Sequence, residues 1–142
     1  MLVVEDDRAV REAYRDVLTD AGHSVALAED GAKGLELLPW HPDVIVLDLS
    51  MPVLDGYEFL RRLEDMPDPH APVLVASVTM PPESLGGVSA VIRKPFALSQ
   101  LVLRVRALAG PRRAGYVDWQ ADFATRVRLI PASWPSDSPR AA

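Results

Sequence analysis

Short apolar runs alternate with helical patterns along most of the chain. The runs are rich in β-branched residues and lack strict alternation with polar residues, which is typical of strands covered on both faces of a sheet. They lie at Leu2–Val4, His23–Ala28, Val44–Leu47, Val73–Ala76 and Val88–Ile92. This pattern predicts five buried strands.

Between most of these runs, apolar residues recur three and four positions apart, as they do on one face of an α-helix. The spacing predicts helices over residues 10–21, 32–38, 56–63 and 98–108. Gly22 follows the first of these, where a helix C-terminus favours a residue with left-handed backbone conformation. Three of these helices separate consecutive strands, and the fourth follows the last strand.

The segment between the fourth and fifth strands is different. Residues 79–88 contain Pro81, Pro82, Gly86 and Gly87, all of which disfavour a helix interior. At most a turn or two of helix fits there, so we expect a stunted or irregular helix at this position.

Strands that alternate with helices predict an α/β fold, because parallel neighbours need crossover connections. We expect a flavodoxin-like (βα)5 doubly wound parallel sheet with strand order 2-1-3-4-5. Ligands of such sheets bind beyond the carboxyl ends of the strands. The first, third and fifth predicted strands end in Glu5-Asp6, Asp48 and Lys94. We expect these side chains to meet at one point.

Length and composition are those of one ordinary domain. The chain has 142 residues, and 49% of them are hydrophobic, which is sufficient for a real core. We expect one domain over residues 1–110 and an extension over 111–142 that is too short to fold independently. The chain has no cysteine, so disulfides, thiolate metal sites and cysteine nucleophiles are excluded.

The charge is unevenly distributed. Residues 1–110 contain 10 Lys and Arg against 17 Asp and Glu, whereas residues 111–142 contain 5 Arg and 3 Asp. An acidic body disfavours contact with the phosphate backbone, so we expect no direct DNA binding. No apolar run approaches the roughly 20 residues that span a bilayer, and no basic segment precedes Leu2. We therefore expect a soluble, cytoplasmic protein without membrane contact.

The acidic residues at the strand ends suit a hard cation. Mg²⁺ prefers oxygen ligands, and Glu5 with Asp6 offers two carboxylates, while Asp7 is better placed to cap the following helix. Asp48 is a candidate nucleophile, because a carboxylate can attack phosphorus and form an acyl phosphate. Neighbouring carboxylates would repel an anionic donor unless a cation neutralised them. Taken alone, however, an aspartate such as Asp48 is most often a turn or cap residue.

Two further strand ends extend this candidate site. Lys94 would place a point charge near a phosphoryl oxygen, and Pro95 permits a cis bond that could aim the lysine inward. Ser77 would supply a hydroxyl that can donate to a phosphoryl oxygen. Each residue also has an ordinary interpretation, Lys94 as a surface lysine and Ser77 as a plain strand-end residue.

The four strand ends together match a known pattern. The motifs are Val3-Val4-Glu5-Asp6-Asp7, Leu47-Asp48-Leu49-Ser50-Met51-Pro52-Val53-Leu54-Asp55-Gly56, Pro72-Val73-Leu74-Val75-Ala76-Ser77 and Arg93-Lys94-Pro95-Phe96. Over residues 1 to about 110 the chain resembles the receiver domain of two-component response regulators, of a stand-alone type with an extension.

This resemblance implies that Asp48 is the phosphoacceptor and that the donor is a histidine kinase or phosphotransfer protein. It further implies that Asp6, Asp48 and the backbone carbonyl of Ser50 hold Mg²⁺, with Glu5 contributing through water. Such a protein acts through regulated binding to a downstream protein, here unknown, and is not an enzyme. A homodimer is left open.

The resemblance also implies that Lys94 pairs with the phosphoryl oxygens and that Ser77 is the switch hydroxyl. The chain departs from the family in three places. Val91 replaces the usual aromatic residue three positions before the lysine, and Val78 replaces a small alanine. Only 17 positions separate Ser77 from Lys94, several fewer than usual. We therefore expect the family's commonest dimer and partner face to be altered.

Two other functions are consistent with this fold. One is a docking or dimerisation module that works without phosphorylation, although the retained acidic, hydroxyl and lysine positions count against it. The other is an aspartate-nucleophile phosphatase, which would need a second carboxylate two residues after Asp48, where this chain has Ser50.

Overall fold

The computed structural model describes residues 1–67 and 71–110. The predicted extension, residues 111–142, lies outside the described residues, so its assignment stays a prediction. The elements follow the chain in the order β1 (Leu2–Val4), α1 (Arg8–Asp20), β2 (Ala26–Ala28), α2 (Gly31–Leu37), the 3₁₀-helix η1 (Leu38–Trp40), β3 (Ile45–Leu47), α3 (Gly56–Glu64), β4 (Val73–Ser77), β5 (Ala90–Arg93) and α4 (Leu98–Ala109).

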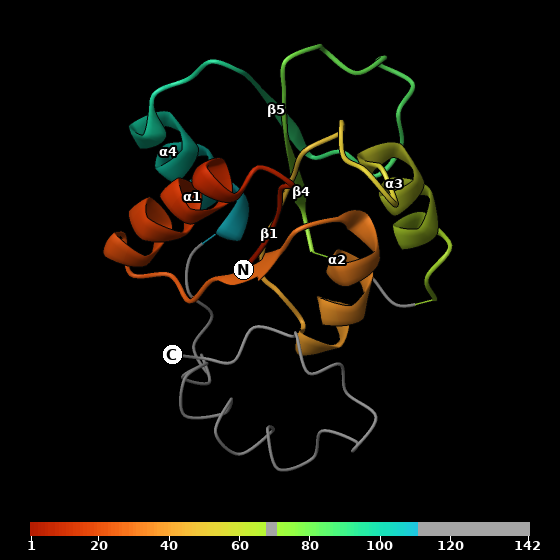
Figure 1. Cartoon of the computed structure of the whole chain (residues 1–142), viewed down its shortest axis with the longest axis horizontal. Helices are drawn as coiled ribbons and strands as arrows, with labels where there is room; N and C mark the ends of the chain where they lie inside the picture. Colours follow the sequence, from red (N-terminus) through yellow and green to blue (C-terminus); the bar gives the residue numbers. More distant parts are fainter. Residues whose placement is uncertain (68–70, 111–142) are drawn as a thin grey trace. The chain divides into compact units, whose positions relative to one another are not determined.

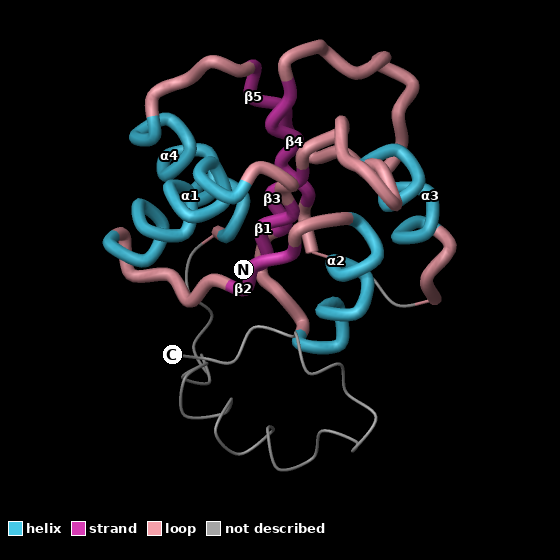
Figure 2. The backbone as a smooth tube through the Cα atoms, viewed as in Figure 1, coloured by secondary structure: helices cyan, strands magenta, loops and turns pink. Residues whose placement is uncertain are grey.

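The strands form one parallel sheet in the order β2-β1-β3-β4-β5, so the predicted flavodoxin-like topology is confirmed (Figures 1 and 2). The second strand is shorter than predicted, since only Ala26–Ala28 is strand. The register explains this, because Ala26 pairs with Leu2, the first residue of β1. Because β1 has three residues, it can pair with only three residues of β2.

Helices cover the sheet on both faces. Helices α1 and α4 pack together on one face, and α2 and α3 lie on the other (Figures 1 and 2). On the first of these faces, side chains from the sheet meet the two helices in an apolar core. Its buried members are Met1, Val3, Tyr14, Leu18, Val44, Val46, Leu74, Ala76, Ile92, Leu101 and Val105. None of the helices within the described residues is long and apolar enough to cross a membrane.

The connection between β4 and β5 contains no helix in residues 78–89, all of which are described. The expected stunted or irregular helix is thus absent altogether, within the limit of a turn or two that the prolines and glycines set. The loop instead lies against α3, where a Cβ atom added to Gly86 would collide with the Glu64 carboxylate. Gly87 has a φ of 77° and faces Leu60 of the same helix. This part of the loop therefore packs against α3.

Aspartates begin three helices and fix where each one starts. Asp7, Asp30 and Asp55 each accept a hydrogen bond from the backbone N–H three residues later, at 3.1, 2.9 and 2.9 Å. Such a cap satisfies one of the free N–H groups of the first turn and places negative charge at the positive end of the helix dipole. The predicted capping role of Asp7 is confirmed.

Val53 carries the one unfavourable backbone conformation among the β-branched residues that the structure describes. Its φ is 67°, and its side chain is 86% exposed, so no packing compensates. We expect Val53→Asn to stabilise the protein by about 1 kcal/mol, because asparagine adopts the left-handed region more readily than valine. Urea unfolding would measure this gain. Val78→Asn, at an exposed valine with an ordinary backbone, should change stability little, and an equal gain there would contradict this explanation.

Candidate functional site

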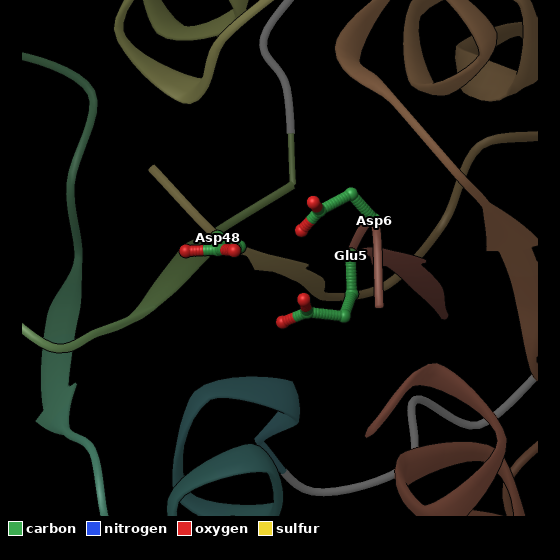
Figure 3. Close-up of side chains that lie close together, drawn as sticks. All are labelled: Glu5, Asp6 and Asp48. Atoms are coloured by element: carbon green, nitrogen blue, oxygen red, sulfur yellow. The ribbon is translucent and has the colours of Figure 1, made fainter. Parts of the chain in front are cut away.

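The acidic residues of the sequence motifs meet at the carboxyl ends of β1 and β3. These strands are neighbours, and the Asp48 amide donates to the Val4 carbonyl at 3.0 Å, which brings the two strand ends together. One carboxylate oxygen from each of Glu5, Asp6 and Asp48 lies within 4.8 Å of the other two. Figure 3 shows the Glu5 and Asp6 side chains extending toward Asp48. The predicted convergence of these residues is present in the structure.

Two of the three carboxylates are buried. Glu5 is 2% exposed and Asp48 is 7% exposed, whereas Asp6 is exposed. Burial raises the pKa of Glu5 to about 7; the hydrogen bond from Lys94 opposes this rise, and the charge of Asp48 adds to it. Burial also raises the pKa of Asp48, against the attraction of Lys94. The site therefore concentrates negative charge where solvent stabilises it poorly.

Lys94 forms ion pairs with two carboxylates of this cluster. Its Nζ donates to Glu5 Oε2 at 2.8 Å and lies 3.8 Å from Asp48 Oδ2. Its backbone amide donates to the Ser77 carbonyl at 2.8 Å, so the end of β4 sets the position of Lys94. The peptide bond between Lys94 and Pro95 is cis. The ordinary interpretation of Lys94 as a surface lysine does not describe these contacts.

The two serines of the candidate site lie where the motifs predict. Ser77 ends β4 and is 2% exposed. The backbone amide of Ser50 donates to Asp48 Oδ1 at 3.3 Å, which orients the Asp48 carboxylate. The roles expected for the Ser77 hydroxyl and the Ser50 carbonyl stay predictions.

The loop after Asp48 turns tightly and returns at Gly56. The Gly56 amide donates to the Leu49 carbonyl at 3.0 Å. A Cβ atom at position 56 would collide with the Asp48 carbonyl oxygen and would lie 2.6 Å from Leu49 Cα. Only a residue without a side chain lets α3 begin this close to Asp48. Asp55 and Gly56, which start α3, therefore help to fix the position of the Asp48 backbone.

Arg11 is a site residue that the sequence patterns did not reveal. Its Nη1 donates to the backbone carbonyls of Glu5 at 2.8 Å and of Asp6 at 3.1 Å. The sequence carried one signal, because Arg11 stands in the first turn of α1, where the helix dipole disfavours a positive charge. Such a position is retained more readily when the charge has a specific partner.

A shallow apolar groove adjoins Lys94. It has a volume of about 470 Å³ and runs between the first turns of α1 and α4. Tyr14 and Phe96 stack in its wall, with ring centroids 5.8 Å apart. Val78, 67% exposed, lines the groove from the end of β4. The groove is lined by Val10, Ala13, Tyr14, Val78, Lys94, Pro95, Phe96 and Leu98.

The chemistry of the acidic cluster fits a divalent cation such as Mg²⁺. The ligands on offer are carboxylate oxygens, which hard cations prefer, and they lie close enough together to share one ion. Two of the carboxylates have pKa values raised by burial, so a cation would relieve an existing electrostatic cost. Glu5, Asp6 and Asp48 are the residues that would hold it.

The sequence has relatives among response regulators. The response regulator MprA of Mycobacterium sp. strain KMS is 45% identical over 114 residues, which cover 76% of this chain and 49% of that protein. MprA of Mycobacterium leprae is 44% identical over 114 residues, with 76% and 50% covered. The chain thus spans about half the length of these curated relatives.

Solved structures and the family comparison agree with this likeness. The receiver domain of the Francisella response regulator 1452 has a TM-score of 0.69 and 30% identity, over 76% of this chain and 93% of that one. Chemotaxis protein CheY4 of Vibrio cholerae has a TM-score of 0.66 and 28% identity, over 75% and 95%. Residues 1–106 match the response regulator receiver domain. On these matches, this chain belongs to the response regulator receiver domain family.

Proposed function

We propose that this protein accepts a phosphoryl group on Asp48 and acts as a regulated binding module in a two-component pathway. The observation that carries the proposal is the placement of Asp48 beside both an acidic pair and Lys94, at the end of β3. Phosphoryl transfer depends mostly on positioning and on neutralising charge, and this arrangement offers both. The role is signalling, without turnover of a metabolite.

The covalent step needs an accessible carboxylate and a suitable donor. An Asp48 carboxylate oxygen gives an electron pair to phosphorus and forms a P–O bond. The bond between phosphorus and the donor, such as an imidazole nitrogen, breaks, and its electron pair stays with the donor. When bound, Mg²⁺ supplies positive charge that offsets the negative charge of the carboxylates and the phosphoryl group.

Lys94 supplies the second positive charge. Before transfer its ammonium is held by Glu5 at 2.8 Å and lies farther from Asp48, at 3.8 Å. A phosphoryl group on Asp48 would offer it new anionic oxygens, and Ser77 could donate to the same group. If Lys94 and Ser77 move toward the phosphoryl group, the ends of β4 and β5 would change shape, and a partner protein could bind the changed surface selectively.

Response regulators interact with histidine kinases or phosphotransfer proteins. For this chain we propose the same class of donor, which would approach from the exposed side of the acidic cluster. The groove beside Lys94 offers apolar contact area there, formed by Val10, Val78 and Leu98 among others. The downstream target would be a protein.

Intact mass spectrometry tests this proposal. Incubation with acetyl phosphate and Mg²⁺ should add one phosphoryl group to the wild-type protein and none to Asp48→Asn. The matched control is Asp43→Asn, at an exposed aspartate before the same strand, which should be modified like the wild type. A wild-type mass that stays unchanged, or an Asp48→Asn variant that gains the group, would overturn the proposal.

A further inference from the structure

Arg11 connects the first turn of α1 to the loop that carries the acidic pair. Its Nη1 nitrogen donates to the Glu5 carbonyl at 2.8 Å and to the Asp6 carbonyl at 3.1 Å. The same residue's backbone amide donates to the Asp7 carbonyl at 2.9 Å. Three consecutive carbonyl oxygens, those of residues 5–7, are therefore bound by one residue. Hydrogen bonds from a charged donor are about twice as strong as neutral ones.

The position of this charge has a cost within the helix. A cation near a helix N-terminus opposes the dipole, an effect of about 0.3–1 kcal/mol. Asp7, the N-cap, relieves part of it by accepting from the Val10 amide at 3.1 Å. Arg8, the first residue of the helix, forms an ion pair with Glu12 on the helix surface instead. Of these two arginines, Arg11 is the one directed at the loop.

The cluster is contacted by two cations that play different parts. Lys94 binds the carboxylate of Glu5, so it competes with any metal ion for that group. Arg11 binds the backbone carbonyls of Glu5 and Asp6, so its side chain does not take up their carboxylate oxygens. The Glu5 carboxylate is further oriented by the Asp7 amide, which donates to Oε1 at 3.2 Å. The side chain of Arg11 thereby holds the loop by its backbone and occupies none of the carboxylate oxygens that would bind a cation.

We infer that Arg11 is a positioning residue for the Mg²⁺ ligands, one that holds the backbone of Glu5 and Asp6 so that their carboxylates face Asp48. The inference rests on the metal site of the proposed function but does not require phosphoryl acceptance. Groups that orient metal ligands from behind typically contribute 10- to 100-fold to metal affinity.

Calorimetric titration with Mg²⁺ tests the inference. Arg11→Met keeps the length and apolar stem of the side chain but removes its charge and donors. We expect it to bind Mg²⁺ about tenfold more weakly. Loss of charge alone would do the opposite, since removing a nearby cation should tighten Mg²⁺ binding. Unchanged or tighter binding in Arg11→Met would therefore overturn the inference.

Two further variants sharpen this test. Both side-chain hydrogen bonds come from one nitrogen, so Arg11→Lys can reproduce them and should restore binding to within about threefold of the wild type. Arg15→Met removes an arginine that pairs with Asp16 on the exposed side of the same helix, and should bind Mg²⁺ like the wild type. A loss as large in Arg15→Met would indicate a general effect of charge or helix stability and would overturn the inference.

A second measurement needs neither metal nor phosphodonor. In the metal-free protein, amide hydrogen exchange at Asp7 should be faster in Arg11→Met than in the wild type, because the loop loses its anchor, and unchanged exchange would count against the inference. Phosphorylation by acetyl phosphate should then require more Mg²⁺ but reach a similar maximal rate. If the wild type accepts no phosphoryl group, the proposed function fails while the Mg²⁺ and exchange results still decide the role of Arg11.

Discussion

Gly56→Ala is expected to destabilise the protein by about 3 kcal/mol and to displace the loop between Asp48 and Gly56. The added Cβ atom would collide with the Asp48 carbonyl oxygen and approach Leu49 Cα at 2.6 Å, and both are backbone atoms. The backbone here cannot yield locally, because the Gly56 amide is bonded to the Leu49 carbonyl and Asp55 caps α3. Thermal unfolding should show a midpoint lower by about 10 °C.

Gly86→Ala is the matched control for this prediction. Its Cβ atom would also collide with a neighbour, but that neighbour is the Glu64 carboxylate at the end of a flexible, exposed side chain. The carboxylate can rotate into solvent, so we expect a cost below about 1 kcal/mol. If the two variants were equally stable, the close approach of backbone at Gly56 would not be what fixes the loop. Gly56→Ala should also accept phosphoryl groups more slowly, whereas Gly86→Ala should not.

Stability without metal is expected to fall as the pH rises from about 4.5 to about 7, by about 3 kcal/mol from Glu5 alone. The sign follows from burial, which raises the pKa of this carboxyl in the folded protein from 4.5 to about 7. Below pH 4.5 both folded and unfolded forms are protonated at Glu5, and no penalty applies. Above pH 7 both are ionised, and the folded form carries the full cost of a buried charge.

Glu5→Gln isolates this contribution. Urea unfolding in the presence of a chelator, repeated across this pH window, should show that the stability of the variant relative to the wild type increases with pH. Glu12→Gln, at an exposed glutamate of α1, should keep the wild-type slope. Saturating Mg²⁺ should recover stability in the wild type at pH 8, because an ion that binds only the folded state stabilises it. Parallel pH profiles for wild type and Glu5→Gln would contradict the assigned cost.

The alternation of apolar runs and helical patterns predicts a flavodoxin-like sheet, and that fold supplies the strand order. The convergence of the acidic residues then follows from where the apolar runs end. Asp7 is likewise predicted as a cap from its position before a helical pattern. The contacts of Arg11 could not be predicted, because they are made with backbone carbonyls, which every residue carries. The sequence does not indicate which carbonyls the guanidinium reaches. Nor could the pairing of Lys94 with Glu5, because the strand ends specify a meeting point but not which oxygen the ammonium selects.

The β4–β5 connection shows a further boundary of sequence patterns. Pro81, Pro82 and the two glycines indicate that a regular helix does not form, and the structure agrees. They do not indicate where the loop lies instead. Its position depends on Gly86 and Gly87 packing against Leu60 and Glu64 of α3, which is a contact between segments distant in the sequence.

Asp48, the acidic pair and the Lys94 ammonium come from three separate strands, which meet only in the assembled sheet. A nascent or partly unfolded chain would contain all of these residues but would not bring them together. Under the proposed function, only correctly folded copies would therefore accept a phosphoryl group. The hydrogen bonds between neighbouring strands would then also decide which copies of the protein can signal.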